Sequence, residues 1–324
     1  MNNFEYIQPK TLKEASQALG NDWQTALPFA GGTDLLGLMK DEIESPNKLV
    51  NLKSIANLNN ISYVPEKGLT IGALVTINEI AGHPLINEKY SVLAQAAKEV
   101  ASPQLRNVGT IGGNICQRPR CWYFRGDFHC LRKGGDICYA VDGRNKFHCV
   151  VGGGPCFIVY PSDTAVALTA LDAKVVIFSD KKSRSIPIKD FFVLPEVNVE
   201  RENVLRPGEI VTEVQIPDLP ANTESSYLKL KERRAWDFAI VSVAAVVQKN
   251  GASFTSGSIA LGGIAPVPWF EKEVSAQLAG LNISAENIEQ LSNKALKGAE
   301  PLADNAYKVP LAQNMIKKIL LKFS

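Results

Sequence analysis

Apolar and polar positions alternate along the chain in short runs, which predicts a succession of brief helices and strands. Residues 11–20 place apolar side chains at helical spacing between a Thr-x-x-Glu capping pattern and Gly20, and the same pattern at Thr76 and Glu79 opens a second helix. Further helices are expected at 91–101, 164–171, 274–278, 285–296 and 311–321. Strands are expected at 25–29, 49–52, 61–64, 69–75, 157–160, 174–178, 209–216, 227–231, 240–248 and 258–264.

Two glycine-rich turns interrupt this pattern. The first is Ala30-Gly31-Gly32-Thr33-Asp34-Leu35, which follows a predicted strand, and the second spans residues 106–114 (RNVGTIGGN). Adjacent glycines let the backbone approach a ligand closely and point amide groups at a phosphate. A tight turn without a ligand remains an alternative for each, but the pair favours one shared phosphate-bearing ligand. Asp163 suits either a helix N-cap or a ligand contact.

The chain divides at residues 218–226, where prolines and small polar residues predict a linker. A domain of residues 1–217 precedes it. Residues 227–324 follow as a smaller α+β domain.

Composition narrows the class of protein. The 324 residues are 45% hydrophobic and 21% charged, and 35 basic residues against 33 acidic ones give a net charge of +2. This balance offers no electrostatic reason to bind nucleic acid, and no apolar run is long enough to enter a membrane. The amino terminus shows neither a twin-arginine pair nor an apolar signal, so we expect assembly in the cytoplasm. Export together with a signal-bearing partner is the alternative.

All six cysteines fall between Cys116 and Cys156, and this gathering indicates a need for sulfur. Disulfides suit small secreted domains, whereas this chain is long and carries no recognisable signal. Zinc sites usually contain CxxC pairs, and none is present. A cluster of iron and sulfide held by thiolates is therefore favoured. A zinc site and free thiols in a loop remain open.

Taken in order, the segments FAGGTDL, RNVGTIGGNIC, PSD and YLKLKERRAWDFAIVSVAA resemble the FAD-binding subunits of molybdenum hydroxylases, the family of xanthine dehydrogenase and carbon monoxide dehydrogenase. The cysteine-rich insert at 116–156 resembles that of the bacterial periplasmic aldehyde oxidoreductase flavoprotein, which carries an additional [4Fe-4S] cluster. A comparable insert occurs in 4-hydroxybenzoyl-CoA reductase.

The resemblance implies an α+β fold. Its first part would be an FAD-binding domain of the p-cresol-methylhydroxylase type, made of two subdomains with the flavin between them. Its last third would be the smaller C-terminal domain of the CO dehydrogenase flavoprotein type.

The resemblance also implies which residues hold FAD. The first turn would wrap the pyrophosphate with its amides, the second turn would hold the cofactor, Asp163 would accept a hydrogen bond from a cofactor hydroxyl, and Lys229 would approach the flavin. The implied FAD residues are Ala30, Gly31, Gly32, Thr33, Asp34, Leu35, Ala101, Thr110, Gly113, Asn114, Asp163, Val211 and Lys229.

For the cluster, matching the insert to the aldehyde oxidoreductase type implies the ligands Cys121, Cys130, Cys138 and Cys156, spaced C-x8-C-x7-C-x17-C. Cys116 and Cys149 would be packing residues. His129 and His148 are interpreted as surface or packing residues. Positive charge around the cluster would come from Arg118, Arg120, Arg125, Arg132 and Lys133.

By the same resemblance the chain is an electron-transfer subunit with no catalytic residue for the substrate. Its expected partners are a molybdenum-cofactor subunit, a subunit with two [2Fe-2S] clusters, and an external electron acceptor. Two other functions remain as alternatives, a self-sufficient FAD-dependent reductase of the same fold and a zinc-stabilised binding module.

Overall fold

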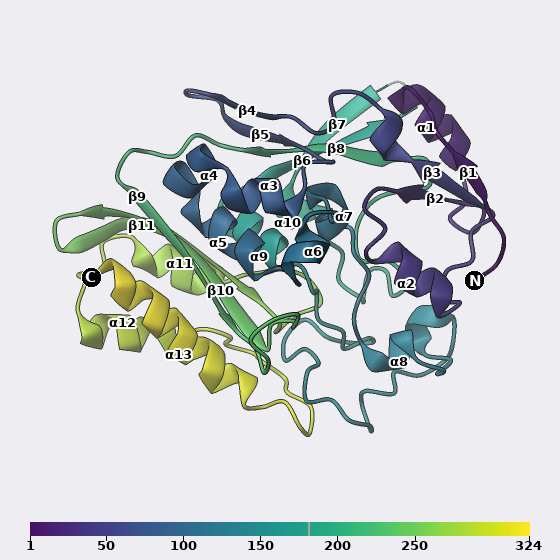
Figure 1. Ribbon diagram of the computed structural model, residues 1–324. Coiled ribbons are helices and arrows are strands. Elements are labelled where there is room, and N and C mark those ends of the chain that lie inside the picture. The colour runs from purple at the N-terminus through teal and green to yellow at the C-terminus, as the bar shows by residue number, and fades with distance from the viewer. Residues whose placement is uncertain (181) are drawn as a thin grey trace.

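Three sheets, each with its own helices, make up the computed structural model, which describes residues 1–180 and 182–324 (Figure 1). The first sheet is parallel, and its strand order is β1 (Glu5–Ile7), β3 (Lys48–Asn51) and β2 (Ala26–Phe29). Helix α1 (Leu12–Leu19) packs on it with its buried face, and its N-cap Thr11 accepts a hydrogen bond from the Glu14 amide, as predicted. Helix α2 (Leu35–Lys40) and a 3-10 turn (Leu52–Ser54) complete this part.

The second sheet is antiparallel, with the strand order β4 (Ile61–Val64), β5 (Gly68–Gly72), β8 (Ile210–Ile216), β6 (Lys174–Ser179) and β7 (Lys182–Pro187). Its helices are α3 (Ile77–Gly82), α4 (Pro84–Lys89), α5 (Ser91–Glu99), α6 (Pro103–Arg106), α7 (Ile111–Ile115), α9 (Asp163–Ala170) and α10 (Ile188–Phe191). Helix α9 is buried along its whole length, because it also contacts the third sheet.

The third sheet is antiparallel in the order β12 (Trp269–Phe270), β11 (Ser253–Gly262), β10 (Val241–Asn250) and β9 (Thr223–Leu230). Successive β10 side chains point to opposite faces. Val243 and Val247 pack toward α13, whereas Ala244 and Val246 join the core around α9. The remaining helical elements are α11 (Lys272–Leu278), α12 (Ala285–Ser292), α13 (Lys308–Leu320) and a final 3-10 turn (Leu321–Phe323).

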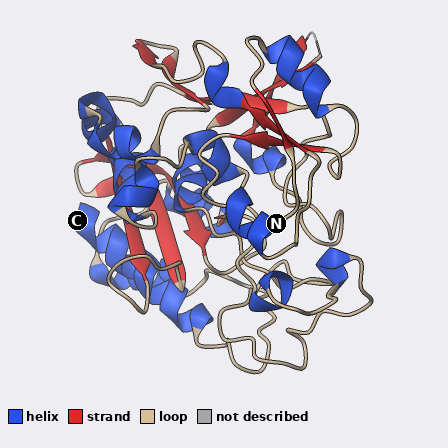
Figure 2. Cartoon of the chain, turned by 45° about the vertical axis from the view of Figure 1, so that its right-hand side comes forward, coloured by secondary structure: helices blue, strands red, loops and turns tan. Residues whose placement is uncertain are grey.

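The cysteine-rich insert contains little regular structure. Within residues 116–156 only α8 (Trp122–Arg125) and a 3-10 turn (Leu131–Lys133) are helical, and the rest runs as loops beside α2 and the lower end of α13 (Figures 1 and 2). Phe124 and Cys130 of the insert share a small apolar cluster with Leu38 of α2. Contacts with side chains of neighbouring parts therefore hold the insert in place.

One predicted strand is absent, the predicted linker is shorter than expected, and one of the two alternatives for Asp163 is excluded. Residues 157–160 form no strand, since the Phe157 carbonyl accepts from the Cys149 amide and the Tyr160 amide donates to the Ala265 carbonyl without a continuous ladder. The predicted linker at 218–226 ends early, because β9 already begins at Thr223. The N-cap of α9 is Ser162 rather than Asp163.

None of the helices among residues 1–180 and 182–324 combines the length and apolar character needed to cross a membrane.

Candidate functional site

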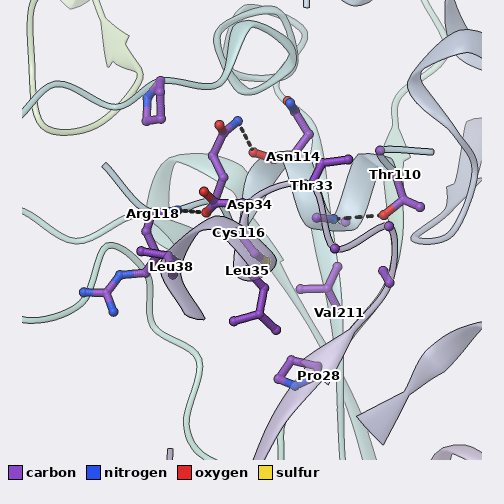
Figure 3. A pocket seen from close by; sticks show the side chains of 18 of the residues that line it. Pro28, Thr33, Asp34, Leu35, Leu38, Thr110, Asn114, Cys116, Arg118 and Val211 are labelled. Carbon is purple, nitrogen blue, oxygen red and sulfur yellow. Dashed lines mark hydrogen bonds between the residues drawn. The ribbon is translucent and has the colours of Figure 1, made fainter. Parts of the chain in front are cut away.

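A cavity of about 620 Å³ lies where the three parts of the chain meet, and we call it the central cavity (Figure 3). Its wall is formed by the loop between β2 and α2, the segment 100–118, the start of α9, the edge of β8 and the loop between β9 and β10. A cavity of this size, open to several loops, suits a cofactor or another sizeable small molecule.

The first glycine turn forms one wall with its backbone. A Cβ atom on Gly31 would lie 2.2 Å from the Val108 carbonyl oxygen, and Gly32 has φ +69, so both positions require glycine. Among the described residues, none accepts a hydrogen bond from the amides of Gly31, Gly32, Thr33 or Asp34. Free amides on a turn that lines a cavity can bind phosphate oxygens.

The second glycine turn packs directly against the first and opens α7. The Thr110 hydroxyl caps the helix by accepting from the Gly113 amide at 3.2 Å. The Asn114 side-chain oxygen accepts from Ser162 at 2.6 Å and from Thr164 at 2.5 Å. This pair of bonds orients the Asn114 amide and joins the second turn to the start of α9.

Asp163 presents a buried carboxylate to the cavity. It accepts hydrogen bonds from the Tyr227 hydroxyl and the Lys229 ammonium, both at 2.7 Å. Burial raises the pKa of Asp163 above its ordinary value, while Lys229 and Tyr227 oppose that shift. Lys229 is 1% exposed and also donates to the Glu99 carbonyl. It lies behind Asp163 and is not among the residues that line the cavity.

The structure gathers twelve of the thirteen residues predicted for FAD around the central cavity. They are Ala30, Gly31, Gly32, Thr33, Asp34, Leu35, Ala101, Thr110, Gly113, Asn114, Asp163 and Val211.

Several parts of the cavity wall were not predicted, among them residues 201–203 and 205 and part of the loop between β9 and β10. Trp236, Asp237 and Phe238 come from the loop between β9 and β10. Trp236 is 65% exposed at φ 52, and its amide donates to the Ala101 carbonyl. The sequence signal for this loop is the ERRAWDF segment. It belongs to the last of the four segments that resemble the family, but no role was assigned to it.

A second, much smaller site lies in the insert, and we call it the thiol pocket. Its walls include the four predicted ligands Cys121, Cys130, Cys138 and Cys156. The cavity between them measures about 10 Å³, which is the room of about one water molecule. A larger group would therefore have to turn the thiols outward.

The protonation of these thiols differs. A hydrogen bond from Cys138, helped by the positive charge of Arg132, lowers the pKa of Cys156 below its ordinary value, and the same bond raises the pKa of Cys138. Burial raises the pKa of Cys121 to about 11. Of these three thiols, Cys156 therefore loses its proton most readily, and it lies beside the cation Arg132.

The other two cysteines lie outside the thiol pocket. Cys116 lines the central cavity, and Cys149 is fully buried. Burial raises the pKa of each to about 12, so both remain neutral thiols. This placement agrees with packing roles.

The two histidines of the insert differ from each other. His129 is exposed, as expected. His148 is buried and lines the thiol pocket, with its Nε2 atom 3.2 Å from the Cys121 sulfur. Burial lowers the pKa of His148 to about 4, so the ring is neutral near pH 7. Its contact with Cys121 was not predicted, because the two residues are 27 positions apart.

The five cations predicted to surround the cluster separate into two groups. Arg120 and Arg125 both bond Asp34 at 2.8 Å, Arg118 pairs with Glu44 and Glu202, and Lys133 donates to the Gly126 carbonyl. Among these five, only Arg132 lines the thiol pocket.

No group of three or more His, Cys, Asp or Glu side chains is spaced to hold a metal ion in the part of the chain that the structure describes. The thiol pocket nevertheless has the donor set of a cluster, because four cysteines line it. It also contains two buried donors without an oxygen or nitrogen acceptor, Nε and Nη2 of Arg132. An anion bound between the thiols would satisfy such groups.

The chain matches two family models in succession. Residues 2–219 match the FAD binding domain in molybdopterin dehydrogenase, and residues 226–323 match the CO dehydrogenase flavoprotein C-terminal domain. The aldehyde oxidoreductase FAD-binding subunit PaoB of Escherichia coli is 38% identical, over 99% of this chain and 98% of that protein. The carbon monoxide dehydrogenase medium chain of Hydrogenophaga pseudoflava is 28% identical, over 98% and 96%.

Solved structures give the same result. A carbon monoxide dehydrogenase from Hydrogenophaga pseudoflava superimposes with a TM-score of 0.78 at 27% identity, covering 99% of this chain and 96% of that one. Quinoline 2-oxidoreductase from Pseudomonas putida 86 superimposes with a TM-score of 0.76 at 24% identity, with the same coverage. The second likeness shows the fold alone.

The fold and the central cavity define a flavoprotein subunit of a heteromeric oxidoreductase. More particularly, this chain belongs to the FAD-binding subunits of the xanthine dehydrogenase, or molybdenum hydroxylase, family. The predicted FAD-binding domain of the p-cresol-methylhydroxylase type and the smaller C-terminal domain of the CO dehydrogenase flavoprotein type are confirmed.

Proposed function

We propose that this chain passes electrons between partner iron–sulfur clusters and an external acceptor, using FAD in the central cavity and a [4Fe-4S] cluster in the thiol pocket. One observation supports the second cofactor most strongly. Four cysteines spread over 36 positions line one pocket, while the other two lie elsewhere. The six cysteines of the insert are thus sorted into a set of four and two packing residues, and four thiolates are what such a cluster takes.

FAD supplies two-electron chemistry when bound, and the protein's task is to place it. Gly31, Gly32 and Thr33 would bind its pyrophosphate through their amides, helped by Thr110 and Asn114 of the second turn. Asp163 would accept a hydrogen bond from a cofactor hydroxyl. Lys229 would act through Asp163, keeping that carboxylate ionised and fixed in place.

The two proposed sites share a wall. Leu38 of α2 lines the central cavity and also packs on Phe124 and Cys130 of the insert. Asp34, at the start of the same helix, bonds Arg120 and Arg125 of the insert. The helix that follows the first glycine turn would therefore keep the two cofactors adjacent, as electron transfer requires.

The substrate would be oxidised on a partner. The relatives are a subunit and a medium chain by name, so we propose a molybdenum-cofactor subunit and a subunit with two [2Fe-2S] clusters as partners. Assembly would take place in the cytoplasm, with export beside a signal-bearing partner as the alternative. The similarity to PaoB favours an aldehyde as the substrate of the assembled enzyme.

Reduction by substrate tests this function. The complex purified with its partners should lose its flavin absorption band when an aldehyde is added without oxygen, whereas this chain alone should keep the band. Turnover of the isolated chain with a nicotinamide and a second substrate would instead establish a self-sufficient reductase. A colourless chain that contains only zinc would establish a binding module.

A further inference from the structure

We propose that Arg132 sets the reduction potential of the cluster in the thiol pocket and that Glu202 holds Arg132 in position. This inference rests on the proposed function, because it requires a cluster between the four thiols. It assigns separate tasks to cations that the sequence presents as one basic group.

Arg132 is buried without enough partners for its charge. Its side chain is 1% exposed and lines the thiol pocket, and only its Nη1 atom makes a hydrogen bond, to Glu202 at 2.6 Å. Its Nε and Nη2 atoms have no oxygen or nitrogen acceptor among the described residues, and the guanidinium lies beside the Cys156 sulfur, whose pKa it helps to lower. A guanidinium remains charged and carries five N–H donors, so buried donors without acceptors are costly. Sulfur anions between the thiols would accept these hydrogen bonds.

The neighbouring cations point elsewhere. Arg120 and Arg125 are paired with Asp34, and the Lys133 ammonium donates to the Gly126 carbonyl at 2.7 Å. Arg118 contacts Glu202 and Glu44 and lines the central cavity instead. Arg132 is therefore the cation of this group placed to act on the thiol pocket.

Glu202 holds the Arg132 guanidinium in position through an ion pair. Its carboxylate is 2% exposed and accepts from Arg132 and from Arg118, so the two arginines share one anion. Glu202 also lines the central cavity. Because Arg118 is also paired with Glu44, Glu202 is the carboxylate that holds Arg132 at the thiol pocket.

The consequence is electrostatic. Adding one electron to a cluster adds one negative charge and breaks no bond to the protein. A buried cation that donates to cluster sulfur favours the reduced state and raises the potential. Removing the charge should make reduction harder without removing a thiol ligand.

The test is a redox titration of the holo chain, followed by the electron paramagnetic resonance signal of the reduced cluster. Arg132→Met should lower the equilibrium constant for one-electron reduction at least about tenfold, which corresponds to about 59 mV. Arg132→Lys should recover part of the shift, and Glu202→Gln should shift the potential less than Arg132→Met. Lys133→Met is the matched control, because it removes a charge one residue away, and its potential should stay near that of the wild type.

The outcomes separate the two proposals. A wild-type chain without iron overturns the proposed cluster and this inference with it. Iron-loaded Arg132→Met with an unchanged potential, or with no larger shift than Lys133→Met, overturns this inference alone. Iron loss in Arg132→Met that Arg132→Lys restores supports the role of the charge. Iron loss in both variants, with flavin retained, overturns it and assigns Arg132 to holding the insert together.

Discussion

The central cavity and the thiol pocket are neighbours built in opposite ways. The cavity is about 620 Å³, and its glycine turns sit between regular strands and helices. The pocket is about 10 Å³ and lies among loops with a single short helix and a 3-10 turn. In the first site the glycine turns form the wall with their backbone, whereas in the second site the functional groups are side chains.

This difference determines what each site depends on. The glycine turns of the cavity are shaped by bonds near in sequence, such as the one from the Gly113 amide to the Thr110 hydroxyl, although Asp163 is held by the distant residues Tyr227 and Lys229. The insert is held by distant side chains, including Asp34, Glu202 and Lys308. Changes in the insert should therefore affect iron and leave flavin bound, while changes at Asp163 should do the reverse.

The largest effect should come from the thiols. Serine at Cys121, Cys130, Cys138 or Cys156 should remove most of the iron, because each supplies one of four ligands. Flavin content should remain close to that of the wild type. Iron and flavin per chain, measured after anaerobic purification, check this prediction.

Cys116→Ser and Cys149→Ser are the controls, since both residues lie outside the thiol pocket. Each should retain its iron. Iron loss from Cys116→Ser combined with full iron in Cys121→Ser would mean that the ligand set is wrong.

The next effect concerns flavin. Asp163→Ala should weaken FAD binding by about tenfold to a hundredfold, the range expected for losing a hydrogen bond to a charged group. The substitution also leaves the buried Lys229 ammonium without its carboxylate partner, so the free energy of unfolding should fall by about 3–5 kcal/mol. Flavin titration and chemical denaturation measure the two effects.

The double variant Asp163→Ala/Lys229→Met separates the effect on FAD binding from the effect on stability. The double variant removes the unpaired charge and should recover part of the lost stability. If it also recovered FAD binding, Asp163 would serve only to neutralise Lys229, contrary to the proposed contact with the cofactor.

A smaller effect should come from the anchor of the insert on the C-terminal domain. The buried Lys308 ammonium donates to the carbonyls of Phe147, His148 and Gly263 at 2.7–3.0 Å. Lys308→Met should lower the free energy of unfolding by about 2–4 kcal/mol, because three carbonyls lose their donor. Lys317→Met removes a partly exposed lysine from the same helix and should change stability much less.

The pH dependence of this effect has a definite sign. Burial lowers the pKa of Lys308 from 10.5 to about 7. Between these values the unfolded chain binds the proton and the folded chain does not, so stability rises with pH across that interval. The wild type should gain stability relative to Lys308→Met from about pH 7 upward. A difference that is constant across this interval would contradict the lowered pKa.

The sequence predicted the parts of the molecule that depend on local backbone geometry. The cap at Thr11, the capping box at Thr76 and both glycine turns lie where their patterns placed them. These signals act within a few residues, so they can be read without knowing the fold.

The parts of the fold and of the sites that could not be predicted depend on contacts between distant segments. Arg132 and Glu202 are 70 positions apart, and Lys229 reaches Asp163 across 66 positions. Nothing in either local pattern selects the partner, so Lys229 was expected at the flavin, and the contact of His148 with Cys121 was not expected. The predicted strand at 157–160 failed for a related reason, because its apolar pattern does not reveal whether a neighbouring strand is available.

The most direct test is a joint count of iron, acid-labile sulfide and FAD in the wild-type chain, purified without oxygen together with its partners and then separated from them. Two cofactors in adjacent sites predict about one FAD, four irons and four sulfides per chain. A chain with FAD but no iron, or with zinc in the thiol pocket, would contradict the claim that this subunit carries a cluster beside its flavin.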